Sequence, residues 1–142
     1  MSAVSMSTIT LRWVEGTMMV ASDSNGHSVV IGRSPDPAHD WVGIKPSELL
    51  LMAVASCATH DVVGIMAKQR EPLQNIKVLC SGDQQASPPY TFTRIHLHYI
   101  AYGPVNPLRL ERAIRLSEDK YCSVISSLRP GVVVTSDFEV VP

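Results

Sequence analysis

Cys57 is the residue best suited to act as a nucleophile, and it lies in the segment Ala55-Ser-Cys-Ala-Thr-His-Asp61. His60 and Asp61 follow it by three and four residues, so the three side chains share one face if the segment is helical. A free thiol ionises at about pH 8.5, and a nearby cation favours the reactive thiolate. His60 could supply that charge.

Cys122 is the second candidate thiol. It follows a predicted helix and precedes Ser123, where a thiol could approach another one. Free cysteine is also one of the commonest buried residues and often acts only as a small hydrophobe, which is the simpler interpretation of Cys57. The two cysteines are far apart in the chain, so the sequence leaves their spatial distance open.

The third cysteine and a histidine pair have simpler interpretations. Cys80 alternates with Ile76 and Val78 in a predicted strand, which indicates core packing. His96 and His98 share one face of the next strand, a spacing that can chelate a metal but is more typical of a solvated or interface face. Since no CxxC or HExxH motif accompanies them, we expect no metal site.

Alternation and turn residues predict an antiparallel meander at the start of the chain. The expected strands span residues 8 to 14, 17 to 22 and 27 to 31, and Asn25-Gly26 supplies the positive φ angles of a hairpin turn. Residues 33 to 45 carry prolines and a glycine among polar residues, which predicts a long loop.

A helix is predicted from Pro46 to about Arg70, because proline suits a first helical turn and Glu71-Pro72 ends the pattern. The stretch from Leu49 to Ala55 leaves no polar face over two turns, so we expect this helix to be buried all round. A chain this short has little material to surround a helix, and we infer that a second subunit covers part of it.

The pattern of residues after Pro72 predicts a hairpin, a helix and a final strand. The strands centre on Ile76 to Cys80 and Ile95 to Ala101, a helix follows Asn106-Pro107 and continues through Tyr121, and the last strand spans Val132 to Val141. The expected order is β-β-β-α-β-β-α-β. This order predicts an α+β fold with an antiparallel sheet and a buried central helix.

Composition excludes several classes of function. A chain of 142 residues predicts one domain over residues 1–142, and a net charge of -1 with pI near 6.5 argues against a nucleic-acid partner. The N-terminus does not resemble a signal peptide, and the Leu49 to Ala55 stretch is far shorter than a membrane span. We expect a soluble cytoplasmic protein in which any disulfide is transient.

Two motifs resemble those of the OsmC/Ohr family. The first is Gly43-Ile-Lys-Pro-Ser-Glu-Leu-Leu-Leu-Met-Ala-Val-Ala-Ser-Cys57, continued by Asp61-Val-Val-Gly64, and the second is Asp119-Lys-Tyr-Cys122-Ser-Val124, followed by Leu128-Arg-Pro-Gly131. The resemblance covers nearly the whole chain. It implies an OsmC-like fold, an intertwined homodimer with packed central helices, and no cofactor.

The resemblance also implies a chemistry for the two cysteines. Cys57 would be the peroxidatic thiol that attacks an organic hydroperoxide, and Cys122 the resolving thiol that forms a disulfide with it. A dithiol reductant would then reset the pair, in defence against oxidative stress.

The chain departs from the well-studied peroxidases of that family at two supporting positions. Val14 and Ser47 occupy the expected places of an arginine and a glutamate that hold the peroxide. Arg12 or Arg33 would have to replace the arginine. In this respect the chain is more similar to the OsmC-like branch than to the established peroxidases.

Glu48 is the candidate replacement for the glutamate, nine residues before Cys57. In one helix this separation is about 180° of rotation and roughly 14 Å of rise, which directs Glu48 away from its own Cys57. A partner subunit's glutamate, or a bend near Pro46, would be needed.

We therefore expect a thiol peroxidase that reduces organic hydroperoxides. The alternative is a noncatalytic dimer that binds a hydrophobic or thiol-bearing small molecule at its interface. A third alternative is other thiol chemistry, such as transfer or hydrolysis, for which no residue nominates a substrate.

Overall fold

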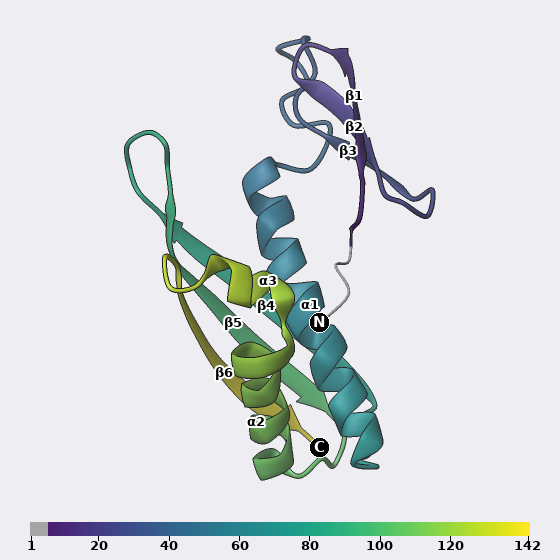
Figure 1. Ribbon diagram of the computed structural model, residues 1–142, viewed down its shortest axis with the longest axis vertical. Helices are drawn as coiled ribbons and strands as arrows, with labels where there is room; N and C mark the ends of the chain where they lie inside the picture. The colour runs from purple at the N-terminus through teal and green to yellow at the C-terminus, as the bar shows by residue number, and fades with distance from the viewer. Residues whose placement is uncertain (1–5) are drawn as a thin grey trace. The chain divides into compact units, whose positions relative to one another are not determined.

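The computed structural model describes residues 6–142 (Figure 1). The chain divides after Leu49 into two compact units, the second being Leu50–Pro142, and each is described by itself. The elements are β1 (Thr10–Glu15), β2 (Met18–Ser22), β3 (Ser28–Ile31), α1 (Pro46–Lys68), β4 (Asn75–Gln84), β5 (Phe92–Tyr102), α2 (Pro107–Leu116), a π-helical turn (Ser117–Tyr121), α3 (Ser123–Leu128) and β6 (Val133–Val141).

The first unit contains the predicted meander, an antiparallel sheet in the order β1-β2-β3. The predicted turn between β2 and β3 is present, and the Asp23 carboxylate accepts the backbone N–H groups of Asn25 and His27. Gly26 has the predicted positive φ, at 88, but Asn25 does not. The following segment is the predicted loop. Only isolated bridges, Ile31 with Ile44 and Arg33 with Trp41, connect it.

Helix α1 confirms the prediction to within two residues at its C-terminal end. Its buried residues recur at every fourth position and form one stripe: Val54, Ala58, Val62 and Met66. The expectation of burial all round is wrong for the single chain, because Met52 and Val63 are 49% and 42% exposed. Successive residues are related by about 100°, so Met52 and Val63 lie within about 20° of each other, roughly 100° to 120° around the helix from the centre of the buried stripe.

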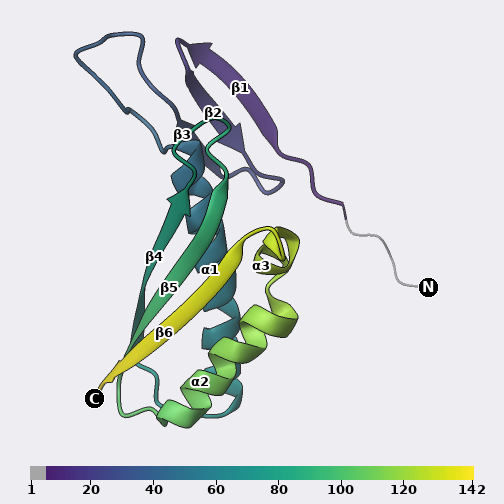
Figure 2. The same ribbon diagram turned by 90° about the vertical axis from the view of Figure 1, so that its left-hand side faces the viewer.

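The second unit is a sheet in the order β4-β5-β6 with helices on one face, as Figures 1 and 2 show. Strands β4 and β5 form the predicted antiparallel hairpin, whereas β5 and β6 are parallel. The expectation of a wholly antiparallel sheet is therefore wrong for this pair. Parallel neighbours need a crossover connection, and the segment from α2 to α3 supplies it.

The core of the second unit joins one face of β5 to the helices. The predicted alternation in β5 is confirmed, because its core-facing residues are fully buried: Ile95, Leu97, Tyr99 and Ala101. They pack against the α1 stripe and against α2, through Leu110, Ala113 and Ile114. Burial of this apolar surface fixes α1 and α2 on the sheet.

The helix predicted to continue through Tyr121 changes form after Leu116. A π-helical turn follows, and it closes with a bond from the Cys122 N–H to the Ser117 carbonyl at 2.7 Å. The wider turn rotates the side chains that follow, and Tyr121 at its end is 53% exposed. Helix α3 begins immediately afterwards and was not predicted.

Candidate functional site

Cys57, Asp61 and Cys122 form a cluster in the second unit. The two sulfur atoms and a carboxylate oxygen of Asp61 all lie within 4.8 Å of one another. Cys57 and Asp61 are half-buried, and Cys122 is only 2% exposed. The structure thus brings together the two cysteines whose distance the sequence left open.

Helix α1 positions two members of this cluster. Cys57 and Asp61 are separated by one helical turn, so their side chains project from the same side of α1. Val54 and Ala58 lie next to them on the buried stripe and fix this side of the helix against the core. The apolar pattern of α1 therefore sets the direction in which Cys57 points.

The π-helical turn and α3 position Cys122. Its backbone has φ -74 and ψ 105, which ends the turn and makes it the N-cap of α3. Its Sγ accepts the backbone N–H of Ile125 at 3.5 Å, as a capping side chain does. Ile125 is fully buried and holds the start of α3 in the core.

Ser117 connects the two halves of the site. Its hydroxyl is fully buried and lies 2.9 Å from Oδ2 of Asp61 and 3.2 Å from the carbonyl oxygen of Ala58. The serine therefore orients the Asp61 carboxylate beside the cysteines. Asp61 was noted in the sequence only as a neighbour of Cys57, and its i,i+4 spacing was the one available signal.

Burial changes the acidity of two of the thiols. The pKa of Cys122 is raised to about 11, first by burial and then by its hydrogen bond with the Cys57 thiol. Burial also raises the pKa of Cys80, which packs against the core as predicted. Cys122 is therefore protonated at neutral pH, and its attack on another sulfur requires a proton acceptor.

A second polar network, not anticipated from the sequence, adjoins Cys122. Glu118 accepts hydrogen bonds from the Tyr99 hydroxyl at 3.4 Å and from the Ser136 hydroxyl at 3.0 Å. Burial raises the pKa of Glu118, and burial followed by the Glu118 charge raises that of Tyr99. The guanidinium of Arg129 donates to the Glu118 carbonyl at 3.0 Å and fixes this turn.

A groove of about 580 Å³ begins beside the cysteine cluster. Its lining residues come from α1, the residue that follows α1, α2 and the π-helical turn: His60, Asp61, Gly64, Ile65, Lys68, Gln69, Leu116 and Tyr121. Asp61 belongs to both the groove and the cluster. A small molecule with an apolar body could therefore bind next to Asp61, against Ile65 and Leu116.

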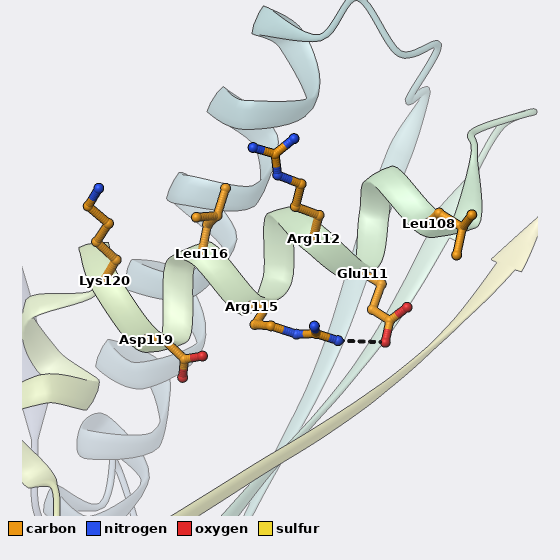
Figure 3. A pocket seen from close by; sticks show the side chains of 7 residues that line it. All are labelled: Leu108, Glu111, Arg112, Arg115, Leu116, Asp119 and Lys120. Atoms are coloured by element: carbon orange, nitrogen blue, oxygen red, sulfur yellow. Dashed lines mark hydrogen bonds and ion pairs between the residues drawn. The ribbon is translucent and has the colours of Figure 1, made fainter.

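A second hollow of about 290 Å³ lies along α2 (Figure 3). Glu111 and Arg115 form an i,i+4 ion pair at 2.9 Å, while Arg112 and Lys120 point to the other side of the helix. None of the residues that line this hollow belongs to the cysteine cluster. We therefore place the chemistry at the cysteines and not here.

The predicted supporting residues are distributed between the two units. His60 is exposed and lines the groove. The first unit contains Arg12 on β1, Arg33 in the segment between β3 and α1, and Glu48 in the first turn of α1. Their support of Cys57 therefore stays a prediction. The Arg33 guanidinium lies 4.4 Å from the centre of the Trp41 ring.

The histidine pair on β5 lies on the sheet face away from the helices. One carboxylate oxygen of Asp137 binds His96 at 3.0 Å and His98 at 2.7 Å, and these hydrogen bonds lower the pKa of Asp137. His96 also contacts the Thr135 hydroxyl at 2.8 Å. These contacts tie β5 to β6, which is consistent with the predicted solvated face.

Residues 37–137 match the family model described as OsmC-like protein. The chain belongs to the OsmC-like family. Protein YhfA of Escherichia coli strain K12 is 35% identical over 133 residues, which cover 92% of this chain and 96% of that protein. The family resemblance predicted from the two cysteine motifs is confirmed.

Solved structures share the fold. A crystal structure of a hypothetical protein from Aquifex aeolicus VF5 aligns with a TM-score of 0.86 and 28% identity, covering 96% of this chain and 97% of that one. An organic hydroperoxide resistance protein OsmC from Legionella pneumophila aligns with a TM-score of 0.72 and 16% identity, covering 98% and 100%. The predicted OsmC-like α+β fold is confirmed.

Family membership also bears on α1. By length and composition alone this helix could cross a membrane. Four of its residues form part of the core, however, and proteins of the OsmC-like family are soluble. We therefore assign α1 as the core helix of a soluble protein.

Proposed function

We propose that the protein is a thiol peroxidase that reduces organic hydroperoxides. The observation that carries this proposal is the cluster in which the Cys57 and Cys122 sulfur atoms and the Asp61 carboxylate lie within 4.8 Å of one another. Two thiols this close together are candidates for a disulfide, in which the sulfur atoms are about 2.05 Å apart. The match to the OsmC-like family supports the same chemistry.

In the proposed first step, the Cys57 thiolate attacks the terminal oxygen of the peroxide and the O–O bond breaks. Cys57 becomes a sulfenic acid, and the departing alkoxide takes a proton to become the alcohol. Cys57 is half-buried, whereas Cys122 is almost completely buried. This difference in exposure supports Cys57 as the thiol that meets the substrate.

In the second step, the Cys122 sulfur attacks the Cys57 sulfur and water leaves, which forms the disulfide. Because burial raises the pKa of Cys122 to about 11, its proton must be removed during the attack. Asp61 is the carboxylate in the cluster, and we assign it as the acceptor of this proton. A dithiol reductant then restores both thiols by exchange.

The thiolate of Cys57 needs a nearby positive charge or hydrogen-bond donor. His60 is three residues from Cys57 on α1, and Arg12 and Arg33 are the arginines nominated by the sequence. We keep these three residues and Glu48, from the same chain or from a partner, as the proposed supporting groups.

The active form is proposed to be a cytoplasmic homodimer. Met52 and Val63 expose apolar side chains on one flank of α1, to the side of its buried stripe, and a second copy of the helix would cover them. The groove beside Asp61, with its apolar Ile65 and Leu116, suits a hydroperoxide that carries a hydrophobic body.

Thiol counting after peroxide treatment tests the proposed reaction. Reduced protein contains three cysteines, and cumene hydroperoxide should consume two of the thiols while alcohol forms. Cys57→Ser should abolish this reaction, and Cys122→Ser should stop it at the sulfenic acid. Cys80→Ser is the matched control and should react like wild type. Survival of the wild-type thiols in excess peroxide would overturn the proposal.

The groove also favours a second candidate function, noncatalytic binding of a hydrophobic or thiol-bearing small molecule. Gln69 lines the groove, and its Oε1 is buried without a hydrogen-bond partner in the described chain. A ligand with a polar donor could satisfy this atom. Binding that persists in Cys57→Ser, with no thiol consumption in wild type, would favour this function over the peroxidase.

A further inference from the structure

We infer that the reduced Cys57, Asp61 and Cys122 side chains bind a thiophilic divalent cation of the zinc class. This inference concerns the reduced thiols alone and does not depend on the proposed peroxidase reaction. It departs from the sequence-based expectation, which looked for metal ligands only at His96 and His98 and found no accompanying motif.

The composition of the cluster matches the donors that zinc prefers. Zinc is bound by cysteine sulfur, histidine nitrogen and carboxylate oxygen, usually in a tetrahedron with distances of about 2.0 to 2.3 Å. Donors around such an ion lie roughly 3.5 to 4 Å apart. The three donor atoms here already lie within 4.8 Å of one another, which is close to the separations that a bound ion requires.

The backbone geometry supports a preorganised site. Cys57 and Asp61 come from one rigid turn of α1, and Cys122 is fixed where the π-helical turn meets α3. Metal sites gain precision when their ligands come from helices held by core packing. Three ligands from two elements leave a fourth position for water or an external thiol.

Ser117 provides the outer hydrogen bond that ligating carboxylates commonly have. Its hydroxyl lies 2.9 Å from Asp61 Oδ2, which leaves the other carboxylate oxygen available to the ion. The serine is completely buried, so this orientation does not depend on solvent. Loss of such an outer partner typically weakens metal binding by about 10 to 100-fold.

The two thiols and the Asp61 carboxylate lie close together, and a bound cation would offset their negative charges once the thiols ionise. A divalent cation replaces the two thiol protons and neutralises both thiolates. Metal affinity should therefore rise with pH, and binding should release protons.

Cobalt titration of the reduced full-length protein tests the inference directly. Under anaerobic conditions we expect about one Co²⁺ per chain, with sulfur-to-cobalt charge-transfer absorption, and displacement of cobalt by zinc. Zinc should also protect Cys57 from iodoacetamide. Absence of the charge-transfer band from the reduced wild-type protein would overturn the inference, whatever the variants do.

Variants identify the ligands. Cys57→Ser and Cys122→Ser should each remove the charge-transfer band or weaken binding by more than about 100-fold, beyond the effect of losing an outer partner. Asp61→Asn, which retains a hydrogen-bond acceptor for Ser117, should weaken zinc binding by at least about tenfold. Circular dichroism of each variant establishes that it is folded.

Cys80→Ser is the matched control, since Cys80 is half-buried but lies outside the cluster. It should bind cobalt as tightly as wild type, with the same band. Loss of the band in Cys80→Ser, a full band with wild-type affinity in either of the other cysteine variants, or an unchanged affinity in Asp61→Asn would each overturn the assigned ligand set.

Discussion

The Ser117 hydroxyl lies 2.9 Å from Oδ2 of Asp61, and this contact joins the start of the π-helical turn to the middle of α1. The same turn ends at Cys122, and Asp61 is one helical turn from Cys57. A single buried hydroxyl therefore fixes the relative position of the segments that carry the two cysteines. The cluster depends on this contact.

Ser117→Ala should destabilise the protein and loosen the site. The substitution leaves the half-buried Asp61 carboxylate without its hydroxyl partner, and such a loss costs about 1 to 3 kcal/mol of unfolding free energy. Urea denaturation measures the effect. Ser126→Ala, at an exposed position of α3, is the control and should change stability by less than about 0.5 kcal/mol. Equal stability of the two variants would contradict the importance assigned to Ser117.

Alkylation of Cys122 should be slow at neutral pH and should keep accelerating at high pH. Because only the thiolate reacts, and because the pKa is raised from 9.0 to about 11, the thiolate fraction near pH 7 is roughly a hundredfold below that of an ordinary thiol. Peptide mapping after iodoacetamide pulses measures the rate, with urea-unfolded protein as the control. A rate that levels off below pH 9 in the folded protein would contradict this pKa.

Glu118→Gln should alter the pH dependence of stability. Burial raises the pKa of Glu118, so between its unfolded pKa and its higher folded pKa the native state holds more protons than the unfolded state. Wild type therefore loses stability relative to Glu118→Gln as pH rises through this window, which begins at about pH 4.3. Urea denaturation between pH 4 and 7 measures the difference. A difference that stays constant, or that changes in the opposite direction, would contradict this account of Glu118.

Met52→Lys and Val63→Lys should convert the proposed dimer to monomer. Both residues lie on the same exposed flank of α1, where a charge would be trapped between two apolar helices of the proposed dimer. Light scattering coupled to size-exclusion chromatography reports the mass. Leu108→Lys on α2, where the side chain is 75% exposed, is the control and should leave the mass unchanged. A wild-type chain that is already monomeric would contradict the proposed dimer.

Local patterns explain which features could be predicted. The meander, α1 and the β4-β5 hairpin follow from short-range periodicity and turn residues, and each prediction was confirmed. The spacing of Cys57 and Asp61 is also local. The proximity of Cys122 is not, because it depends on how α2 and the π-helical turn pack against α1 and β5.

The sequence-based predictions that were wrong concern features set by contacts between distant segments, which local patterns do not encode. The parallel pairing of β5 with β6 depends on the path of the connection between them, which alternation in either strand does not encode. The π-helical turn changed the direction of Tyr121, because helical periodicity assumes a constant number of residues per turn. Asp61 gained its place in the site from Ser117, a partner that α1 alone could not indicate.

The central claim is that Cys57 and Cys122 form the redox pair, and peptide mapping after peroxide treatment tests it most directly. Reduced wild-type protein is exposed to one equivalent of cumene hydroperoxide, free thiols are blocked, and the digest is examined by mass spectrometry. The account predicts one intrachain disulfide, between Cys57 and Cys122, with Cys80 blocked as a free thiol. A disulfide that includes Cys80, or unmodified Cys57 and Cys122, would contradict the account.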